Sequence, residues 1–185
     1  MKATSWKAMG CDPRTGRWRL LPAGLLLQTF DPKQDEEVSF TDDLIWAKDK
    51  SGLFRLVVLL QNVQDLKSSL AAVQDIDRAS GGHIQQNGIT IIREDLSASA
   101  SPVVLESKKR WQRSIYRVAS GEEFSRSRLC HHRPEPKGYD PYRLSKEVQK
   151  KRFIFLRPDR FVFAACDSKE EVDRAAARIA EFLEG

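Results

Sequence analysis

Residues 153–165 read FIFLRPDRFVFAA, and this stretch decides the fold. The apolar runs at 153–156 and 161–165 have the length and the aromatic content of β-strands. The four residues between them, RPDR, place a proline second, where its fixed φ suits a tight turn. The pattern predicts an antiparallel hairpin.

A helix is predicted directly after the hairpin. Residues 168–171, SKEE, have the spacing of a capping box, in which Ser168 and Glu171 exchange hydrogen bonds at the start of a helix. Apolar residues then follow at helical spacing and are expected to form the inner face of the helix. They are Val172, Ala176, Ile179, Ala180 and Leu183.

The first half of the chain carries a βαβ pattern. Residues 53–60, LFRLVVLL, are apolar on both faces, as a central strand covered on two sides requires. Asn62 can cap a helix that residues 80–82, SGG, would end. Residues 89–92, ITII, predict a second strand, parallel to the first and reached by a right-handed crossover. The apolar residues of the intervening helix are Val63, Leu66, Leu70 and Val73.

The N-terminal region is less regular. Residues 1–35 contain three prolines and three glycines, so we expect an irregular lead-in that packs on the domain, with one extended piece at 24–30. Residues 40–46 mix apolar and acidic side chains, as a short helix does.

The middle of the chain is an excursion between the two regular parts. Trp111, Ile115 and Val118 repeat at helical spacing, which favours a helix. Residues 121–141 are polar and rich in turn formers, so we expect a long surface loop there.

The predicted order is therefore βαβ, excursion, ββα. This is the order of the thioredoxin-like α/β fold, with a central mixed sheet flanked by helices. We expect one such domain over residues 36–185, preceded by the lead-in at 1–35.

One family shares more than this order. Residues 155–162, FLRPDRFV, resemble the C-terminal domain of phenol-hydroxylase-type flavin-dependent monooxygenases, which closes with a strand, an Arg-Pro-Asp-Gly turn and an amphipathic helix. Arg160 stands here in place of the glycine. The resemblance covers residues 17–183 and implies a stand-alone version of that domain. Within the full-length monooxygenases the domain is associated with dimer contacts and lies away from the hydroxylation chemistry. Weaker matches are RLLP at 19–22, DL at 43–44, GLFRLV at 52–57 and YDPY at 139–142.

Neither familiar redox activity is expected. A Gly-x-Gly-x-x-Gly turn after a strand, which would bind a flavin or a nucleotide, does not occur. The cysteines Cys11, Cys130 and Cys166 are too far apart in sequence for a Cys-x-x-Cys pair. His131 and His132 adjoin Cys130, but neighbouring loop residues seldom point at one metal ion. We therefore expect no cofactor and no metal.

Charge and hydropathy bear on partners and location. The net charge of +5 favours loose association with polyanions or acidic surfaces. Residues 108–117 interleave basic side chains with Trp111 and Tyr116, which is the pattern of a protein surface that binds nucleic acid. A solvated helix face explains the pattern equally well. No nucleic-acid recognition motif accompanies these residues. We therefore do not expect nucleic acid as a partner. Because no apolar run approaches the ~20 residues of a membrane span and no secretory signal is visible, we expect no membrane partner and a cytoplasmic location.

Two functions fit a domain without a visible catalytic motif. One is cofactor-independent binding of a hydrophobic intermediate of specialised metabolism, with cyclisation or isomerisation of the pericyclic, Diels-Alder type, for which no catalytic residue can be assigned. The other is a non-catalytic module that forms a homodimer or docks on a flavin monooxygenase. For the first, the ligand-binding candidates near the strand ends are Trp111, Tyr116, His131, His132 and Tyr139, each of which can instead be a core aromatic or part of a solvated loop.

Overall fold

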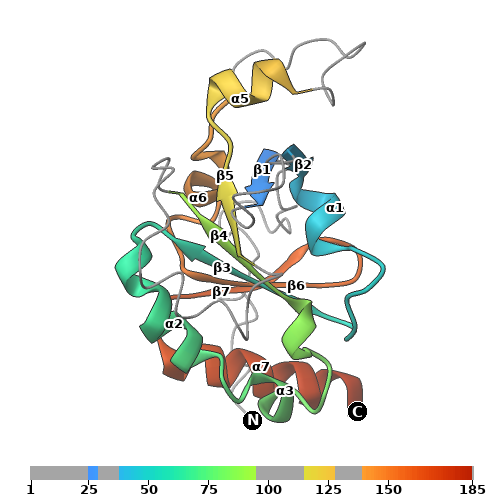
Figure 1. Cartoon of the computed structure of the whole chain (residues 1–185). Helices are drawn as coiled ribbons and strands as arrows, with labels where there is room; N and C mark the ends of the chain where they lie inside the picture. The colour runs from blue at the N-terminus through green and yellow to red at the C-terminus, as the bar shows by residue number, and fades with distance from the viewer. Residues whose placement is uncertain (1–24, 29–37, 95–114, 128–138, 185) are drawn as a thin grey trace.

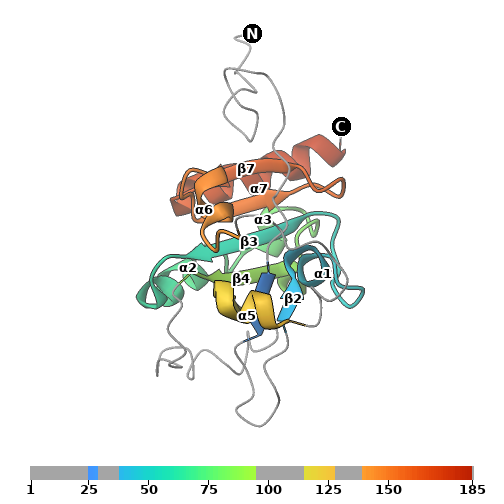
Figure 2. The same cartoon turned by 90° about the horizontal axis from the view of Figure 1, so that it is seen from above.

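The computed structural model describes residues 25–28, 38–94, 115–127 and 139–184. Its core is a single mixed β-sheet. Within these residues the strands lie in the order β2-β1-β5-β4-β3-β6-β7. Figure 2 shows the sheet from above, with β7 at one side, β3 and β4 in the middle, and β1 and β2 at the other side. The strands are β1 Leu25–Gln28, β2 Val38–Phe40, β3 Arg55–Leu60, β4 Ile89–Arg93, β5 Ile115–Val118, β6 Phe153–Leu156 and β7 Val162–Cys166.

The strand pairing is that of a thioredoxin-like fold. The central strand β3 runs parallel to β4, with Leu56 opposite Ile89, and antiparallel to β6. The strand β7 pairs antiparallel with β6, which confirms the predicted hairpin. The chain is therefore an α/β protein with a βαβ unit, an excursion and a ββα unit, as the sequence predicted.

Helices cover both faces of the sheet (Figure 1). Alternate residues of β3 face opposite sides of the sheet and so belong to two different apolar cores. On one side, Leu56, Val58 and Leu60 pack with residues of α2, α3 and α7. On the other side, Val57 and Leu59 pack with residues of α1 and of the end of α6. The helices are α1 Thr41–Ile45, α2 Leu66–Ala72, α3 Ile76–Ala79, α5 Gly121–Arg126, α6 Arg143–Glu147 and α7 Lys169–Glu184.

The crossover between β3 and β4 is more broken than the sequence suggested. A 3-10 turn, Val63–Asp65, precedes α2, and α3 follows as a separate turn of helix. The Asn62 side chain accepts a hydrogen bond from the Gln64 amide, as a capping residue does. Gly81 and Gly82 end the crossover with φ of 61° and 81°, a conformation that glycine adopts without strain.

Two predictions for the excursion were wrong. Residues Ile115 and Val118 belong to the strand β5, not to a helix, because a spacing of three also fits a short strand of β-branched and aromatic residues. The proposed loop at 121–141 begins with α5, whose N-cap Ser120 forms a full capping box with Glu123. The sequence SGEE at 120–123 carries that signal.

The ending of the chain follows the prediction with three differences. Arg160 adopts φ of 69° in the hairpin turn, so the turn keeps a glycine-like conformation without glycine. At the start of α7, Ser168 accepts from the Glu171 amide at 3.3 Å, but the Glu171 carboxylate accepts from the Asp167 amide and not from Ser168. Leu183 is 37% exposed and does not belong to the inner face of α7.

Candidate functional site at the carboxyl ends of the parallel strands

The parallel strands β3, β4 and β5 end on the same side of the sheet, where α/β folds tend to place their sites. Glu94 directly follows β4, and its amide donates to the Leu60 carbonyl at 2.9 Å, which fixes it beside the end of β3. The residue is only 6% exposed. A carboxyl group is thus buried at the strand ends.

The Glu94 carboxyl is incompletely satisfied. Among the residues that the structure describes, none forms a hydrogen bond with its Oε1 atom, which is shielded from solvent. Burial raises the pKa of Glu94, while the Ser145 hydroxyl and the Lys150 charge oppose the rise. Because burial disfavours the charged form, the group holds a proton at higher pH than an exposed glutamate. We call Glu94 together with Ser145 of α6 the Glu94 site.

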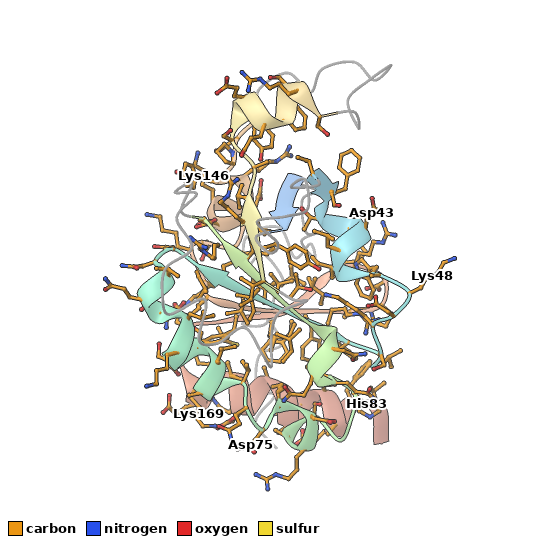
Figure 3. All side chains as sticks on the ribbon, in the orientation of Figure 1. Asp43, Lys48, Asp75, His83, Lys146 and Lys169 are labelled. Atoms are coloured by element: carbon orange, nitrogen blue, oxygen red, sulfur yellow. The ribbon has the colours of Figure 1, made fainter. Side chains whose placement is uncertain are left out.

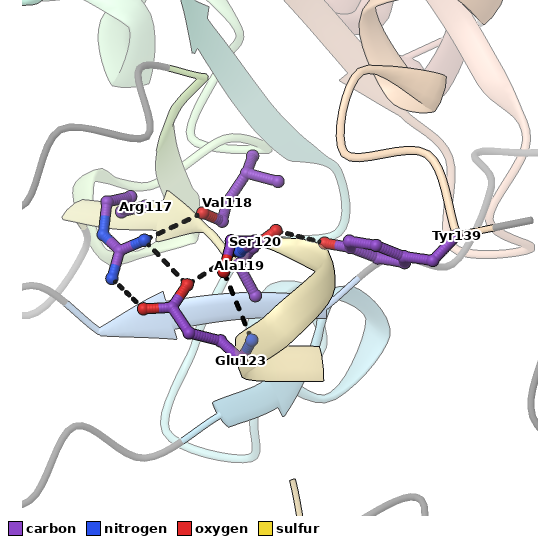
Figure 4. A network of polar contacts seen from close by, with 6 residues as sticks. All are labelled: Arg117, Val118, Ala119, Ser120, Glu123 and Tyr139. Carbon is purple, nitrogen blue, oxygen red and sulfur yellow. Dashed lines mark hydrogen bonds and ion pairs between the residues drawn. The ribbon is translucent and has the colours of Figure 1, made fainter. Parts of the chain in front are cut away.

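A second polar network lies at the end of β5 (Figure 4). The Arg117 guanidinium, on a residue 3% exposed, contacts both carboxylate oxygens of Glu123, at 2.7 and 3.0 Å. Glu123 also accepts from the Ser120 amide at 2.7 Å. The hydrogen bonds from Arg117 hold the pKa of Glu123 at about 2. This network neutralises a buried arginine and anchors α5, which is a structural task.

Tyr139 is tied into the same region (Figure 4). Its hydroxyl donates to the Ala119 carbonyl at 2.7 Å, and its ring stacks on Phe124 with centroids 4.4 Å apart. Burial raises the pKa of Tyr139 to about 12. Its proton is therefore engaged by the protein's own backbone.

The predicted ligand-binding residues do not gather into one cluster where the structure describes them. Tyr116 is 5% exposed and packs in the core with Val57 and Leu59, and burial raises its pKa. Tyr139 belongs to a different cluster, with Ala119 and Phe124. The other three candidates, Trp111, His131 and His132, lie outside the described residues.

The opposite end of the sheet holds charged groups that the sequence reasoning missed. Arg55 is 7% exposed, and within the described residues it donates only to backbone carbonyls. Its guanidinium lies 5.2 Å from the centre of the Trp46 ring. The Lys50 amine donates to the hydroxyl of Thr90, which is fully buried on β4. We call Lys50, Arg55 and Thr90 the Lys50 site. An arginine inside the apolar run 53–60 was the available signal.

Two observations on the described part of the chain concern metal ligands and the Cys166 thiol. No three His, Cys, Asp or Glu side chains are grouped there as metal ligands are. Cys166 is buried, and burial raises the pKa of its thiol to about 12, which leaves it un-ionised and unreactive. None of the described helices is long and apolar enough to cross a bilayer.

Comparison with known proteins shows a distant likeness in structure but none in sequence family. No family model and no curated protein matches the chain. Among solved structures, copper-bound Sco1 from yeast resembles it with a TM-score of 0.45 and 13% identity, over 90% of this chain and 89% of that one. The likeness concerns the course of the chain alone, and the copper of Sco1 is not transferred to this protein.

Proposed function

We propose that the protein binds a largely apolar small molecule at the Glu94 site and catalyses its isomerisation or cyclisation without a cofactor, with Glu94 as the proton-transfer group. The observation that carries this proposal is the buried Glu94 carboxyl, whose Oε1 atom has no hydrogen-bond partner among the residues that the structure describes. Buried polar atoms are nearly always paired, so an unpaired carboxyl oxygen at the strand ends calls for a functional explanation.

The raised pKa of Glu94 suits this chemistry. A general base works best when its pKa lies near the working pH, and burial moves a carboxyl in that direction. In an isomerisation, the Glu94 carboxylate removes a proton from a carbon beside a carbonyl, which breaks that C–H bond and gives an enolate. The resulting carboxylic acid returns the proton to a more distant carbon of the conjugated system. The carboxylate is restored, and no oxidant or metal takes part.

The surroundings of Glu94 fit a substrate of low polarity. The adjoining side of the sheet is lined by buried apolar residues, among them Leu59, Ile92 and Val148. An apolar site strengthens electrostatic interactions and excludes water, and both effects help to hold a reactive conformer for cyclisation.

We further infer that the chain is a relative of the C-terminal domain of phenol-hydroxylase-type monooxygenases. The hairpin turn supports this ancestry, because Arg160 keeps the positive φ that the family's glycine would adopt. Specialised metabolism, in which such monooxygenases are common, is the setting that this ancestry suggests.

The experiment uses a simple probe, a cyclic β,γ-unsaturated ketone whose conversion to the conjugated isomer is followed by ultraviolet absorbance. Wild-type protein should accelerate the conversion with saturation, and Glu94→Gln should lower kcat by about 100-fold or more. The matched control is Glu122→Gln, which changes an exposed carboxylate paired with Arg126. A wild-type rate equal to that of buffer, or an unchanged rate in Glu94→Gln, would contradict the proposal.

A docking or dimerisation module is the second candidate. It is favoured by two exposed apolar residues on the last turn of α7, Phe182 at 59% exposure and Leu183 at 37%. Exposed apolar side chains of this kind often mark contact surfaces. If the protein is such a module, sedimentation should show a dimer for the wild type and a monomer for Phe182→Ser. A wild type that stays monomeric at high concentration would exclude the homodimer. A flavin monooxygenase would then be the partner to test by co-sedimentation.

A further inference from the structure

We propose that Lys50 is a second reactive site, at which its side-chain amine condenses with an aldehyde or ketone to form a Schiff base. The proposal is independent of the function assigned to Glu94. Thr90 and Glu94 are four residues apart on one extended segment, which separates the two sites by about 13 Å.

The geometry of the Lys50 site places the amine inside the protein. Lys50 lies in the loop between α1 and β3, and its residue is partly exposed. Its Nζ atom donates to Oγ1 of Thr90, a residue with no exposed surface. Lys48 gives the contrast, because it is exposed and projects away from the molecule (Figure 3).

The charges around the amine favour its neutral form. The Arg55 guanidinium donates to the Lys50 carbonyl at 3.1 Å and to the Ser51 carbonyl at 2.9 Å, so a fixed positive charge is held next to the lysine. Burial, with the help of Arg55, lowers the pKa of Lys50 to about 8, against an opposing effect of Asp49. Desolvation and a neighbouring cation are the two means by which proteins activate lysine as a nucleophile.

No carboxylate neutralises Arg55 at short range among the contacts found in the described residues. Its Nε atom donates to the Ile45 carbonyl at 3.2 Å, and its Nη1 atom donates to the Gly52 carbonyl at 2.5 Å. Because carbonyl groups carry no net charge, they satisfy the hydrogen bonds of Arg55 without cancelling its positive charge. The guanidinium charge therefore still acts on the Lys50 amine.

The condensation balances without another reactant. The nitrogen lone pair of Lys50 forms the new C–N bond, and one of the two protons of the neutral amine ends on the carbonyl oxygen. The carbinolamine then loses its hydroxyl group together with the second nitrogen proton as water, which leaves a C=N bond on Nζ. The Thr90 hydroxyl accepts a hydrogen bond from the amine, which orients the nitrogen, and it can donate its own proton to the carbonyl oxygen.

The test is reductive trapping with butanal and sodium cyanoborohydride at pH 7, followed by peptide mass mapping. We expect Lys50 to be alkylated about tenfold faster than Lys48, because at this pH a larger share of its amine is neutral. The preference should shrink as the pH rises toward 10.5, where ordinary lysines also lose their protons. Equal or slower labelling of Lys50 at pH 7 would overturn the proposal.

Variants separate a reactive site from a structural one. Thr90→Val should slow labelling of Lys50, and Thr90→Ser should restore it, with Lys48 labelling unchanged in both. Should Thr90→Val fail to fold, the rate ratio of the two lysines in wild-type protein still decides the matter. Lys50→Arg should leave the isomerisation of the unsaturated ketone unchanged, so that the two proposals stand or fall separately.

Discussion

Two buried charged residues, at opposite ends of the sheet, differ in how far their hydrogen bonds are satisfied. At the amino end of β3, the Arg55 guanidinium donates to several backbone carbonyls. At the carboxyl end of β4, one oxygen of the Glu94 carboxyl has no hydrogen-bond partner among the described residues. Both residues are more than nine-tenths buried on the same sheet. A buried charge whose hydrogen bonds are all made supports the fold, because removing it leaves orphaned acceptors. A buried charge with an unmade bond costs stability, and proteins tolerate such a cost chiefly at functional sites.

Replacement of Arg55 should have the largest effect. Arg55→Met leaves the carbonyls of Ile45, Lys50 and Ser51 without their donor, and we expect a loss of about 3–5 kcal/mol in the free energy of unfolding. Urea unfolding followed by circular dichroism measures the loss. The control is Arg78→Met, at an arginine side chain 84% exposed, which should change stability by less than about 0.5 kcal/mol. If Arg55→Met lost less than about 1 kcal/mol in the free energy of unfolding, Arg55 would not be the stabilising charge that the comparison with Glu94 assumes.

The Arg117–Glu123 pair should come next. Glu123→Gln weakens the hydrogen bonds of a buried arginine and half of the α5 capping box, so we expect a loss of about 2 kcal/mol at pH 7. The pKa of Glu123 is lowered to about 2, so its contribution to stability is present above pH 4.5 and is lost as the pH falls toward 2. Urea unfolding at several pH values should show the variant and the wild type converging in acid. A constant difference between pH 5 and pH 2.5 would contradict this account.

Glu94→Gln should change stability in the opposite direction at neutral pH. Because the pKa of Glu94 is raised, its protonated form stabilises the fold below pH 4.5, and this stability is lost as the pH rises through the folded-state pKa. A neutral amide avoids that loss, so we expect Glu94→Gln to be about 1 kcal/mol more stable than wild type at pH 7. Thermal unfolding from pH 4 to pH 8 tests this, and a variant less stable than wild type at pH 7 would argue that Glu94 is an ordinary structural carboxylate.

Arg160→Gly should give the smallest effect. Glycine adopts φ near 69° without the steric cost that arginine bears, which favours the variant by about 1 kcal/mol. The lost ion pair with Asp42, at 2.8 Å between partly exposed side chains, offsets part of this gain. Asp42→Asn removes the ion pair alone and serves as the control. A melting temperature for Arg160→Gly below that of Asp42→Asn would contradict the expectation.

Local patterns predicted the parts of the fold that local forces determine. The apolar runs at 53–60 and 89–92 contain most of β3 and β4 as expected, with β3 beginning at Arg55, because branched apolar runs of that length have few alternatives to a buried strand. The strand β5 was missed because the spacing of Ile115 and Val118 suits a helix equally well, and only pairing with β4 and β1 selects the strand.

The chemistry of both sites depends on contacts that no local pattern reveals. Lys50 meets Thr90 forty residues away, and the contact exists only because Thr90 lies opposite Val57 in the parallel register of β3 and β4. Glu94 has an acidic neighbour in sequence, Asp95, and such pairs are common on solvated surfaces. Burial at the end of β4 distinguishes it, and burial is a property of the folded chain.

The central claim is that Glu94 is a buried carboxyl that keeps its proton above the usual pH, and carboxyl carbon-13 NMR tests it most directly. Protein labelled at the glutamate side-chain carboxyl is titrated from pH 3 to pH 8, and the Glu94 resonance is assigned by its absence in Glu94→Gln. The account predicts that this resonance shifts at a pH clearly above 4.5, the ordinary pKa of a glutamate side chain. A Glu94 resonance that titrates at or below pH 4.5 would contradict the account.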